Sequence, residues 1–166
     1  TLFENRDKQI TNGLDTTDFV TIDADAIKEQ LLDTAERDGT LQTFLMSPEV
    51  KQLENQGENF SKLDFASLVH EESSMIADNT RDAAIEQGRN LILDQVCSNL
   101  TKTTALINQL AAAGYSIRII EIHAEKEFSE QSAFLRYLRD QEQDNGRYVP
   151  TEVINDVYNP DGTSRP

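Results

Sequence analysis

Two short apolar segments each end in acidic residues, and these acids are the first candidates for chemistry. Residues 19–22 read Phe-Val-Thr-Ile and lead into Asp23 and Asp25, while residues 90–93 lead into Asp94. Both segments are short and apolar, which is typical of buried strands. In an open α/β sheet, ligands bind at the carboxyl ends of the strands. A carboxylate there can accept a proton from a substrate hydroxyl or hold a metal ion.

A simpler interpretation exists for Asp25. The residues that follow it, 26–37, have the pattern of a helix, and Asp is a favoured N-cap residue. On this segment alone we favour the interpretation in which Asp25 caps the helix. The pattern of two strands ending in acids is typical of nucleotide hydrolases and kinases, but many parallel strands end in Asp at a turn.

Clustered arginines are the second candidate. The chain holds 15 Lys and Arg residues against 30 Asp and Glu residues, yet Arg136, Arg139 and Arg147 fall close together. Arg136 and Arg139 lie one helical turn apart, and Arg147 follows a Gly turn. Guanidinium groups bind phosphate in a bidentate manner. The alternative is that these arginines pair with the acids of residues 140–144 on a solvated face.

Composition limits the class of protein. The formal net charge of −15 argues against nucleic-acid binding and against anionic membranes. We expect no transmembrane helix and no signal peptide. Cys97 is the single cysteine, which excludes an internal disulfide and favours a cytoplasmic protein. The length fits one domain over residues 1–166, with residues 159–166 as a loop tail.

The hydrophobic pattern predicts an α/β fold with a parallel sheet, because strands alternate with helices. Along the long helix we expect one apolar face, made by Phe65, Leu68, Met75, Ile76, Ala83 and Ala84. With only three strands visible, part of the sheet is expected to be missing from the chain. The expected helices are 2–11, 26–37, 62–87, 100–113, 127–142 and a short one from Pro150, and the expected strands are 19–22, 90–94 and 115–122.

The chain resembles the zeta toxin family of P-loop kinases, the toxin half of bacterial toxin–antitoxin pairs. The resemblance spans roughly residues 14–157 and rests on four segments in the same order and at similar spacing. These segments are FVTIDADAIKEQL, LVHEESSMIADNTRDAAIEQGRNLILD, AAAGYSIRIIEIHAEKEFSEQSAFLRYLR and GRYVPTEVI. The resemblance implies a three-layer P-loop-kinase-like parallel sheet flanked by helices and lacking its first strand.

The resemblance also implies a reaction. The family uses ATP and Mg²⁺ to phosphorylate a hydroxyl of a UDP-amino sugar, typically UDP-N-acetylglucosamine. By position, Asp25 resembles the base that activates the hydroxyl, and Asp78 resembles a substrate-binding acid of the long helix. Asp94 resembles the acid near the substrate and the metal. Arg136 and Arg147 resemble the arginines that bind the ATP phosphates. An antitoxin is the protein partner that the family implies.

The chain departs from the family pattern in three places. The phosphate-binding G-x-x-x-x-G-K-[ST] loop is absent, so we expect a fragment that begins just after that loop, with very weak ATP binding and negligible turnover. Gln95 and Val96 stand where the family often has Gly and Thr. The chain also stops at Pro166, earlier than many relatives. These departures leave two alternatives: a non-catalytic binding domain with the kinase fold, or a kinase for another small-molecule hydroxyl.

The sequence also predicts the environments of His70 and Cys97. His70, on the long helix, either lines a substrate groove or is held within the helix, and we favour the second interpretation. Cys97 has no cationic context in the sequence, so we expect a packed thiol.

Overall fold

The structure is a computed structural model, and it describes residues 15–97, 99–120, 124–141 and 149–163. The helix expected over residues 2–11 lies outside the described residues. In chain order the elements are β1 (Phe19–Asp23), α2 (Ala24–Asp38), a π-helical turn (Leu41–Leu45), α3 (Pro48–Asn55), a 3-10 segment (Lys62–Val69), α4 (His70–Glu86), β2 (Asn90–Asp94), α5 (Leu100–Ala112), α6 (Lys126–Gln141) and α7 (Thr151–Asn155).

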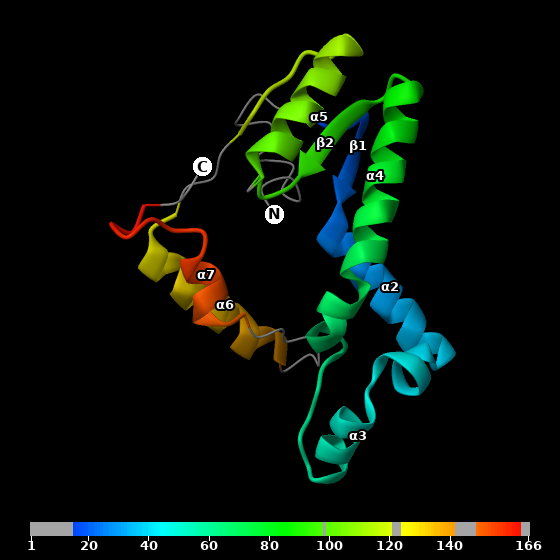
Figure 1. Ribbon diagram of the computed structural model, residues 1–166, viewed down its shortest axis with the longest axis vertical. Helices are drawn as coiled ribbons and strands as arrows, with labels where there is room; N and C mark the ends of the chain where they lie inside the picture. The colour runs from blue at the N-terminus through cyan, green and yellow to red at the C-terminus, as the bar shows by residue number, and fades with distance from the viewer. Residues whose placement is uncertain (1–14, 98, 121–123, 142–148, 164–166) are drawn as a thin grey trace.

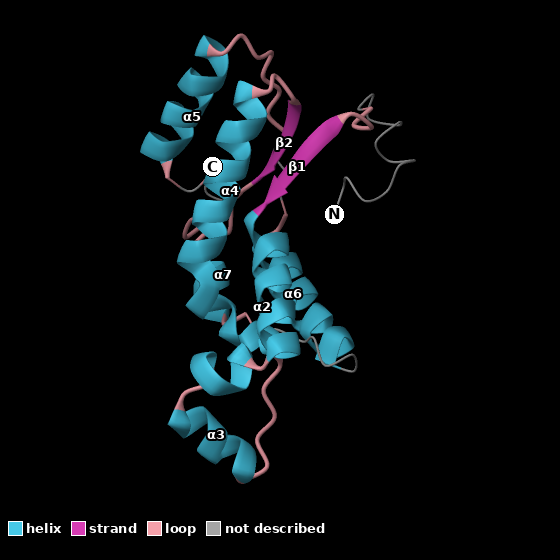
Figure 2. Cartoon of the chain, turned by 90° about the vertical axis from the view of Figure 1, so that its right-hand side faces the viewer, coloured by secondary structure: helices cyan, strands magenta, loops and turns pink. Residues whose placement is uncertain are grey.

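The two described strands form a parallel pair. β1 and β2 are hydrogen-bonded neighbours, and their register places Phe19 opposite Asn90 and Asp23 opposite Asp94. Helix α4 packs against both strands, and Figures 1 and 2 show it running alongside them. Parallel strands need a crossover connection, and here the chain from α2 to α4 supplies it. The expected parallel α/β arrangement is confirmed as a helix-rich α/β fold with a small two-stranded sheet.

The main cluster of buried residues lies where α2 meets the π-helical turn and the 3-10 segment, while Ile22 of β1 is the buried residue of the sheet. Leu32 of α2 and Ser73 of α4 are completely buried. The hydroxyl of Ser73 donates a hydrogen bond to the backbone oxygen of His70 at 2.9 Å, so its burial leaves the donor satisfied. A side chain this small lets α2 and α4 pack closely. The other buried residues of the cluster around Leu32 come from α2, from the π-helical turn with the residue after it, and from the 3-10 segment: Ala35, Leu41, Met46, Phe65, Ala66 and Val69.

Short polar motifs set the helix ends that the sequence predicts. The Ser61–Asp64 capping box is present, with the Ser61 N–H donating to the Asp64 carboxylate at 2.9 Å. Asn99 caps α5 through a bond from the Lys102 N–H at 3.0 Å. Gly39 ends α2 with φ of 81°, a left-handed conformation that glycine adopts without steric cost. These boundaries are confirmed to within a residue or two.

The expected third strand is wrong over its described part. Residues 115–120 have no strand structure, and residues 121–123 lie outside the described residues. Ile119 is 73% exposed, although the sequence pattern would bury it in a sheet. A strand needs a neighbour to accept and donate its backbone hydrogen bonds. Within the described residues the ladder contains β1 and β2 alone, so this segment lacks such a neighbour.

The apolar face expected along residues 62–87 is only partly correct. Phe65 and Ala84 are buried as expected, but Leu68 and Met75 are more than half exposed. The chain is 3-10 helical before His70 and α-helical after it. The two helix types turn by different angles per residue, so one helical period cannot describe the whole segment. The buried face follows Val69 and Ser73 instead.

Helices α6 and α7 form a pair of their own. The Tyr158 hydroxyl, just after α7, donates to the Ala124 backbone oxygen at 3.1 Å and is hydrogen-bonded to the Ser129 hydroxyl of α6. Figure 1 shows this pair standing apart from α2 and α4. The apolar side chains of α6 are exposed: Phe128, Phe134, Leu135 and Leu138. The expected helices at 127–142 and after Pro150 are therefore confirmed as a separate hairpin of helices.

The helical core should dominate stability. We expect Leu32→Ala to lower the free energy of unfolding by about 2–5 kcal/mol, because it leaves a cavity in the core that α2 forms with the π-helical turn and the 3-10 segment. The matched control is Leu100→Ala, at a side chain that is 80% exposed, which should change stability by less than about 0.5 kcal/mol. Urea denaturation measures both, and equal losses in the two variants would contradict this location of the core.

An ion-pair cluster joins α2 to the 3-10 segment. The Lys62 ammonium lies 2.6 Å from the Asp33 carboxylate and 3.5 Å from that of Glu36. The hydrogen bond to Asp33 raises the pKa of Lys62 above its ordinary value, against the opposing effect of partial burial. A raised folded-state pKa stabilises the fold below the unfolded-state pKa, and this stabilisation is lost as pH rises through the folded-state value.

We therefore expect Lys62→Gln to lower the free energy of unfolding by about 0.5 kcal/mol at neutral pH. The difference from the unchanged protein should disappear in strongly alkaline solution, where Lys62 loses its proton. Denaturation curves at the two pH values test this, with Lys51→Gln on α3 as the control. A difference that persists after deprotonation would show that the effect comes from packing and not from charge.

Candidate active site

The carboxyl ends of the two strands meet at one edge of the sheet. Asp23 ends β1, Asp94 ends β2, and the parallel register places these two residues directly opposite each other. Asp94 is exposed and Asp23 is half-buried. The structure thus brings together the two acidic strand ends that the sequence singled out. Oxygen ligands and exposed carboxylates at this edge provide what a Mg²⁺–phosphate group or a substrate hydroxyl requires.

The interpretation of Asp25 as the helix cap is wrong. The N-cap of α2 is Asp23, whose carboxylate accepts hydrogen bonds from the Asp25 N–H at 2.8 Å and the Ala26 N–H at 3.2 Å. Asp25 lies in the first turn, where its side chain is 73% exposed and pairs with the Lys28 ammonium at 2.6 Å. Because Asp23 performs the capping, the Asp25 carboxylate faces solvent beside the strand edge, where a substrate can reach it.

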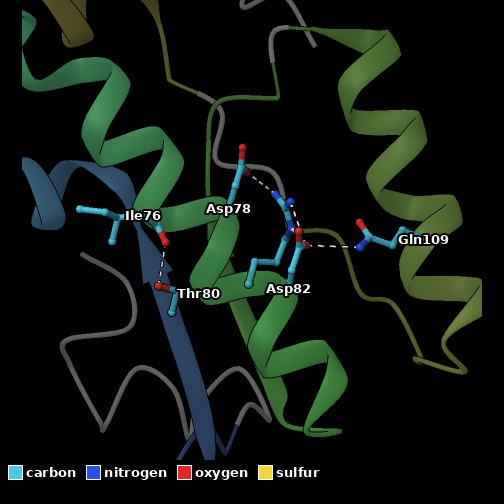
Figure 3. Close-up of polar contacts among 6 residues, drawn as sticks. Ile76, Asp78, Thr80, Asp82 and Gln109 are labelled. Carbon is cyan, nitrogen blue, oxygen red and sulfur yellow. Dashed lines mark hydrogen bonds and ion pairs between the residues drawn. The ribbon is translucent and has the colours of Figure 1, made fainter.

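Asp78 lies on α4 in a polar network with α5. Its carboxylate pairs with the Arg81 guanidinium, which also pairs with Asp82 at 3.0 Å. Asp82 in turn accepts a hydrogen bond from the Gln109 amide of α5 at 3.3 Å. Figure 3 shows Asp78 and Asp82 on the side of α4 that faces Gln109. This network ties α5 to α4 and fixes the direction in which Asp78 points.

A shallow groove of about 480 Å³ lies along the same side of α4. It contains Asp78, the predicted substrate-binding acid, and His70, for which we favoured a purely structural role. His70 is exposed and lines the groove, so the interpretation that placed it in a groove agrees with the structure. The sequence analysis did not identify Lys102, although the Asn99 cap fixes its position in the first turn of α5. Among the described residues, the lining is made of His70, Glu71, Ser74, Met75, Asp78, Asn79 and Lys102.

Of the predicted arginines, the structure describes Arg136 and does not bring it to the strand edge. Arg136 is exposed on α6, which packs against α7, and Arg147 lies outside the described residues. Within the described part of the chain, no ion pair joins Arg136 to a carboxylate. The alternative pairing with the acids of residues 140–144 falls on side chains outside the description. Both roles of these arginines therefore remain predictions.

The loop after β2 differs from expectation at Cys97. The thiol is exposed, so the expectation of a packed thiol is wrong. Its backbone is left-handed, with φ of 55°, which is uncommon for a residue with a side chain. The turn that carries the chain away from Asp94 directs this side chain outward. Gln95 and Val96, which stand where the family often has Gly and Thr, are exposed in the same loop.

The candidate metal ligands are the carboxylates at the strand edge. Among the described residues, no group of three or more His, Cys, Asp and Glu side chains is arranged to hold a metal ion. Mg²⁺ in phosphoryl-transfer sites commonly uses one or two protein carboxylates together with substrate phosphates. Asp94 and the neighbouring Asp23 fit that smaller requirement.

Within the described residues, no helix is both long and apolar enough to cross a membrane.

A comparison with protein families decides the relationship. The family model for zeta toxin matches residues 7–160, which is most of the chain. The chain belongs to the zeta toxin family. No curated protein and no solved structure matches it significantly. The zeta toxin match covers both acidic strand ends, α4 with Asp78, and α6.

Membership of the zeta toxin family indicates a P-loop-kinase-like function. Zeta toxins are nucleotide-using kinases of the type that takes ATP and typically needs Mg²⁺, and they typically act with an antitoxin. The helix-rich α/β fold with a parallel strand pair is consistent with that class.

The division of roles between Asp23 and Asp25 can be tested by stability. We expect Asp23→Ala to lower the free energy of unfolding by about 1 kcal/mol, because the first turn of α2 loses its cap. Asp25→Ala should have a smaller effect, since its carboxylate is exposed and makes a surface ion pair. Thermal or urea denaturation distinguishes the two, and a larger loss for Asp25→Ala would contradict the assignment of the cap.

Proposed function

We propose that this protein is a cytoplasmic zeta-toxin-type kinase that transfers the γ-phosphate of ATP to a hydroxyl of a UDP-amino sugar such as UDP-N-acetylglucosamine. One observation carries the proposal: the register of β1 and β2 sets Asp94 opposite Asp23, with an exposed Asp25 in the next turn. Phosphoryl transfer depends on positioning and on charge stabilisation more than on covalent chemistry. The zeta toxin match supports the reaction class.

In this proposal Asp25 is the general base. It accepts the proton of the attacking sugar hydroxyl as the oxygen bonds to the γ-phosphorus, and ADP leaves. The base has to be within hydrogen-bond reach of that hydroxyl, which needs an exposed carboxylate. Asp25 meets this condition because Asp23 caps α2 in its place. Lys28, paired with Asp25 at 2.6 Å, holds the carboxylate near the start of the helix until substrate arrives.

Asp94 is the residue that would hold Mg²⁺, with Asp23 beside it as the neighbouring carboxylate. The ion supplies positive charge that offsets the charge on the phosphate oxygens. Asp78 is the proposed sugar-binding acid, because it lines the groove along α4. These residues come from two strand ends and one helix in a single α/β domain. We propose that the domain has the three-layer arrangement of P-loop kinases, with helices on both faces of a parallel sheet.

Arg136 and Arg147 are the proposed ligands of the ATP phosphates. Their charge suits that role, because the chain is otherwise strongly acidic and a polyanionic nucleotide needs local cations. Helix α6 stands apart from α2 and α4 in Figure 1. Bringing Arg136 to a nucleotide at the strand edge therefore requires α6 to approach the strands. An antitoxin is the proposed protein partner.

A second candidate function is a non-catalytic binding domain with the same fold. The separation of α6 from the strand edge favours it, since a binding domain has no need to bring Arg136 to a phosphate. A kinase for a different small-molecule hydroxyl is the remaining alternative, and it is favoured by Gln95 and Val96, which stand where the family often has Gly and Thr.

The deciding experiment is phosphoryl transfer from Mg-ATP to UDP-N-acetylglucosamine by the full-length protein, read by mass spectrometry. We expect a product heavier by one phosphate. Asp25→Asn should reduce the rate by about 100-fold or more, because the amide cannot accept the proton. It should leave ATP affinity unchanged.

The matched control is Asp18→Asn. Asp18 is an exposed acid just before the amino end of β1, away from the edge that carries Asp94. Its variant should keep full activity. Full activity in Asp25→Asn would rule out the base assignment, while ATP binding without any transfer would favour the binding domain or another acceptor.

A further inference from the structure

The groove along α4 has an unusual charge arrangement for so acidic a chain. The net charge is −15, and two carboxylates, those of Glu71 and Asp78, line the groove. Among the described residues that line the groove, Lys102 of α5 is the one Lys or Arg. Arg81 of α4, three residues after Asp78, pairs with Asp78 and Asp82. The charge of Asp78 is thereby partly neutralised, which lowers the repulsion that an incoming anion would meet.

The Lys102 side chain is available to a ligand. Its backbone N–H is used by the Asn99 cap at 3.0 Å, which fixes the first turn of α5. Its side chain is exposed, and no carboxylate of the described residues forms an ion pair with it. Lys28, Lys62 and Lys126 each lie within 4 Å of a carboxylate, at 2.6, 2.6 and 3.9 Å. Lys102 thus differs from these three lysines in facing a groove without an acidic partner.

The polar network between α4 and α5 sets the width of the groove. Lys102 and Gln109 are seven residues apart, about two helical turns, so they share one face of α5. Asp78 and Asp82 are likewise four apart on one face of α4. The hydrogen bond from Gln109 to Asp82 at 3.3 Å joins these two faces (Figure 3). Lys102 and Asp78 therefore lie on opposite walls of one groove whose walls are tied together.

We propose that Lys102 binds the phosphate groups of the sugar-nucleotide substrate in this groove. The inference rests on the proposed kinase function and adds a specificity-determining residue to it. A Lys ammonium is a compact cation that binds phosphate through charge-assisted hydrogen bonds. Asp78 on the opposite wall accepts hydrogen bonds from sugar hydroxyls. The groove thus selects a ligand that carries both an anionic part and a hydroxyl-bearing part, and Lys102 binds the anionic part.

The test uses the full-length protein and measures binding and kinetics together. Lys102→Gln should raise the KM and Kd for UDP-N-acetylglucosamine at least tenfold while leaving kcat and the KM for ATP unchanged. Lys102→Arg should restore most of the affinity, because Arg keeps the charge. Free N-acetylglucosamine, which has no phosphate, should bind both the unchanged protein and Lys102→Gln equally weakly.

The matched control is Lys51→Gln on α3, far along the chain from the groove, which should behave as the unchanged protein. Thermal denaturation should show that Lys102→Gln is folded, since its side chain is exposed. An unchanged KM and Kd in Lys102→Gln would overturn this inference and leave the kinase intact. A rise in the KM for ATP instead would assign Lys102 to the nucleotide donor. Absence of any UDP-sugar binding by the unchanged protein would overturn the proposed function and the inference together.

Discussion

The parallel pairing of β1 with β2 is the constraint on which the site depends. Its register sets Asp23 opposite Asp94, so two acids that are far apart in sequence share one edge of the sheet. A slip of one residue would turn every side chain of a strand to the other face. The same edge starts α2, because Asp23 caps that helix. Capping by Asp23 leaves Asp25 exposed at the point where a substrate hydroxyl would arrive.

Packing of the helices holds the residues of this edge in place. Leu32 of α2 and Ser73 of α4 are fully buried, and the two helices that carry Asp25 and Asp78 pack against each other. Helix α4 also packs against both strands. The hydrogen bond from Gln109 to Asp82, which also pairs with Arg81, links α5 to α4. The proposed base and the proposed substrate groove are thus held by one continuous set of contacts.

Local signals in the sequence predicted much of this arrangement, and long-range features were missed. Strand ends, the Asn99 cap and the Gly39 end of α2 follow from residue types over a few positions. The strand expected at 115–122 failed over its described part because a strand depends on a neighbour that local pattern cannot reveal. Asp23 and Asp25 are both suitable N-cap residues, so the sequence alone does not distinguish them. The backbone shows that α2 begins at Ala24 and not at residue 26, which makes Asp23 the cap. Lys102 was missed because its role depends on the residues of α4 across the groove, such as Asp78, which are distant from it in the sequence.

In the proposed complex the sugar nucleotide binds at the β1–β2 edge and along the α4–α5 groove. Amide NMR spectra of the full-length protein, recorded as UDP-N-acetylglucosamine is added, test this binding mode. We expect chemical-shift changes at Asp25, Asp78, Asp94 and Lys102, with little change on α3. Changes confined to α6 and α7, or the absence of changes at saturating ligand, would contradict it.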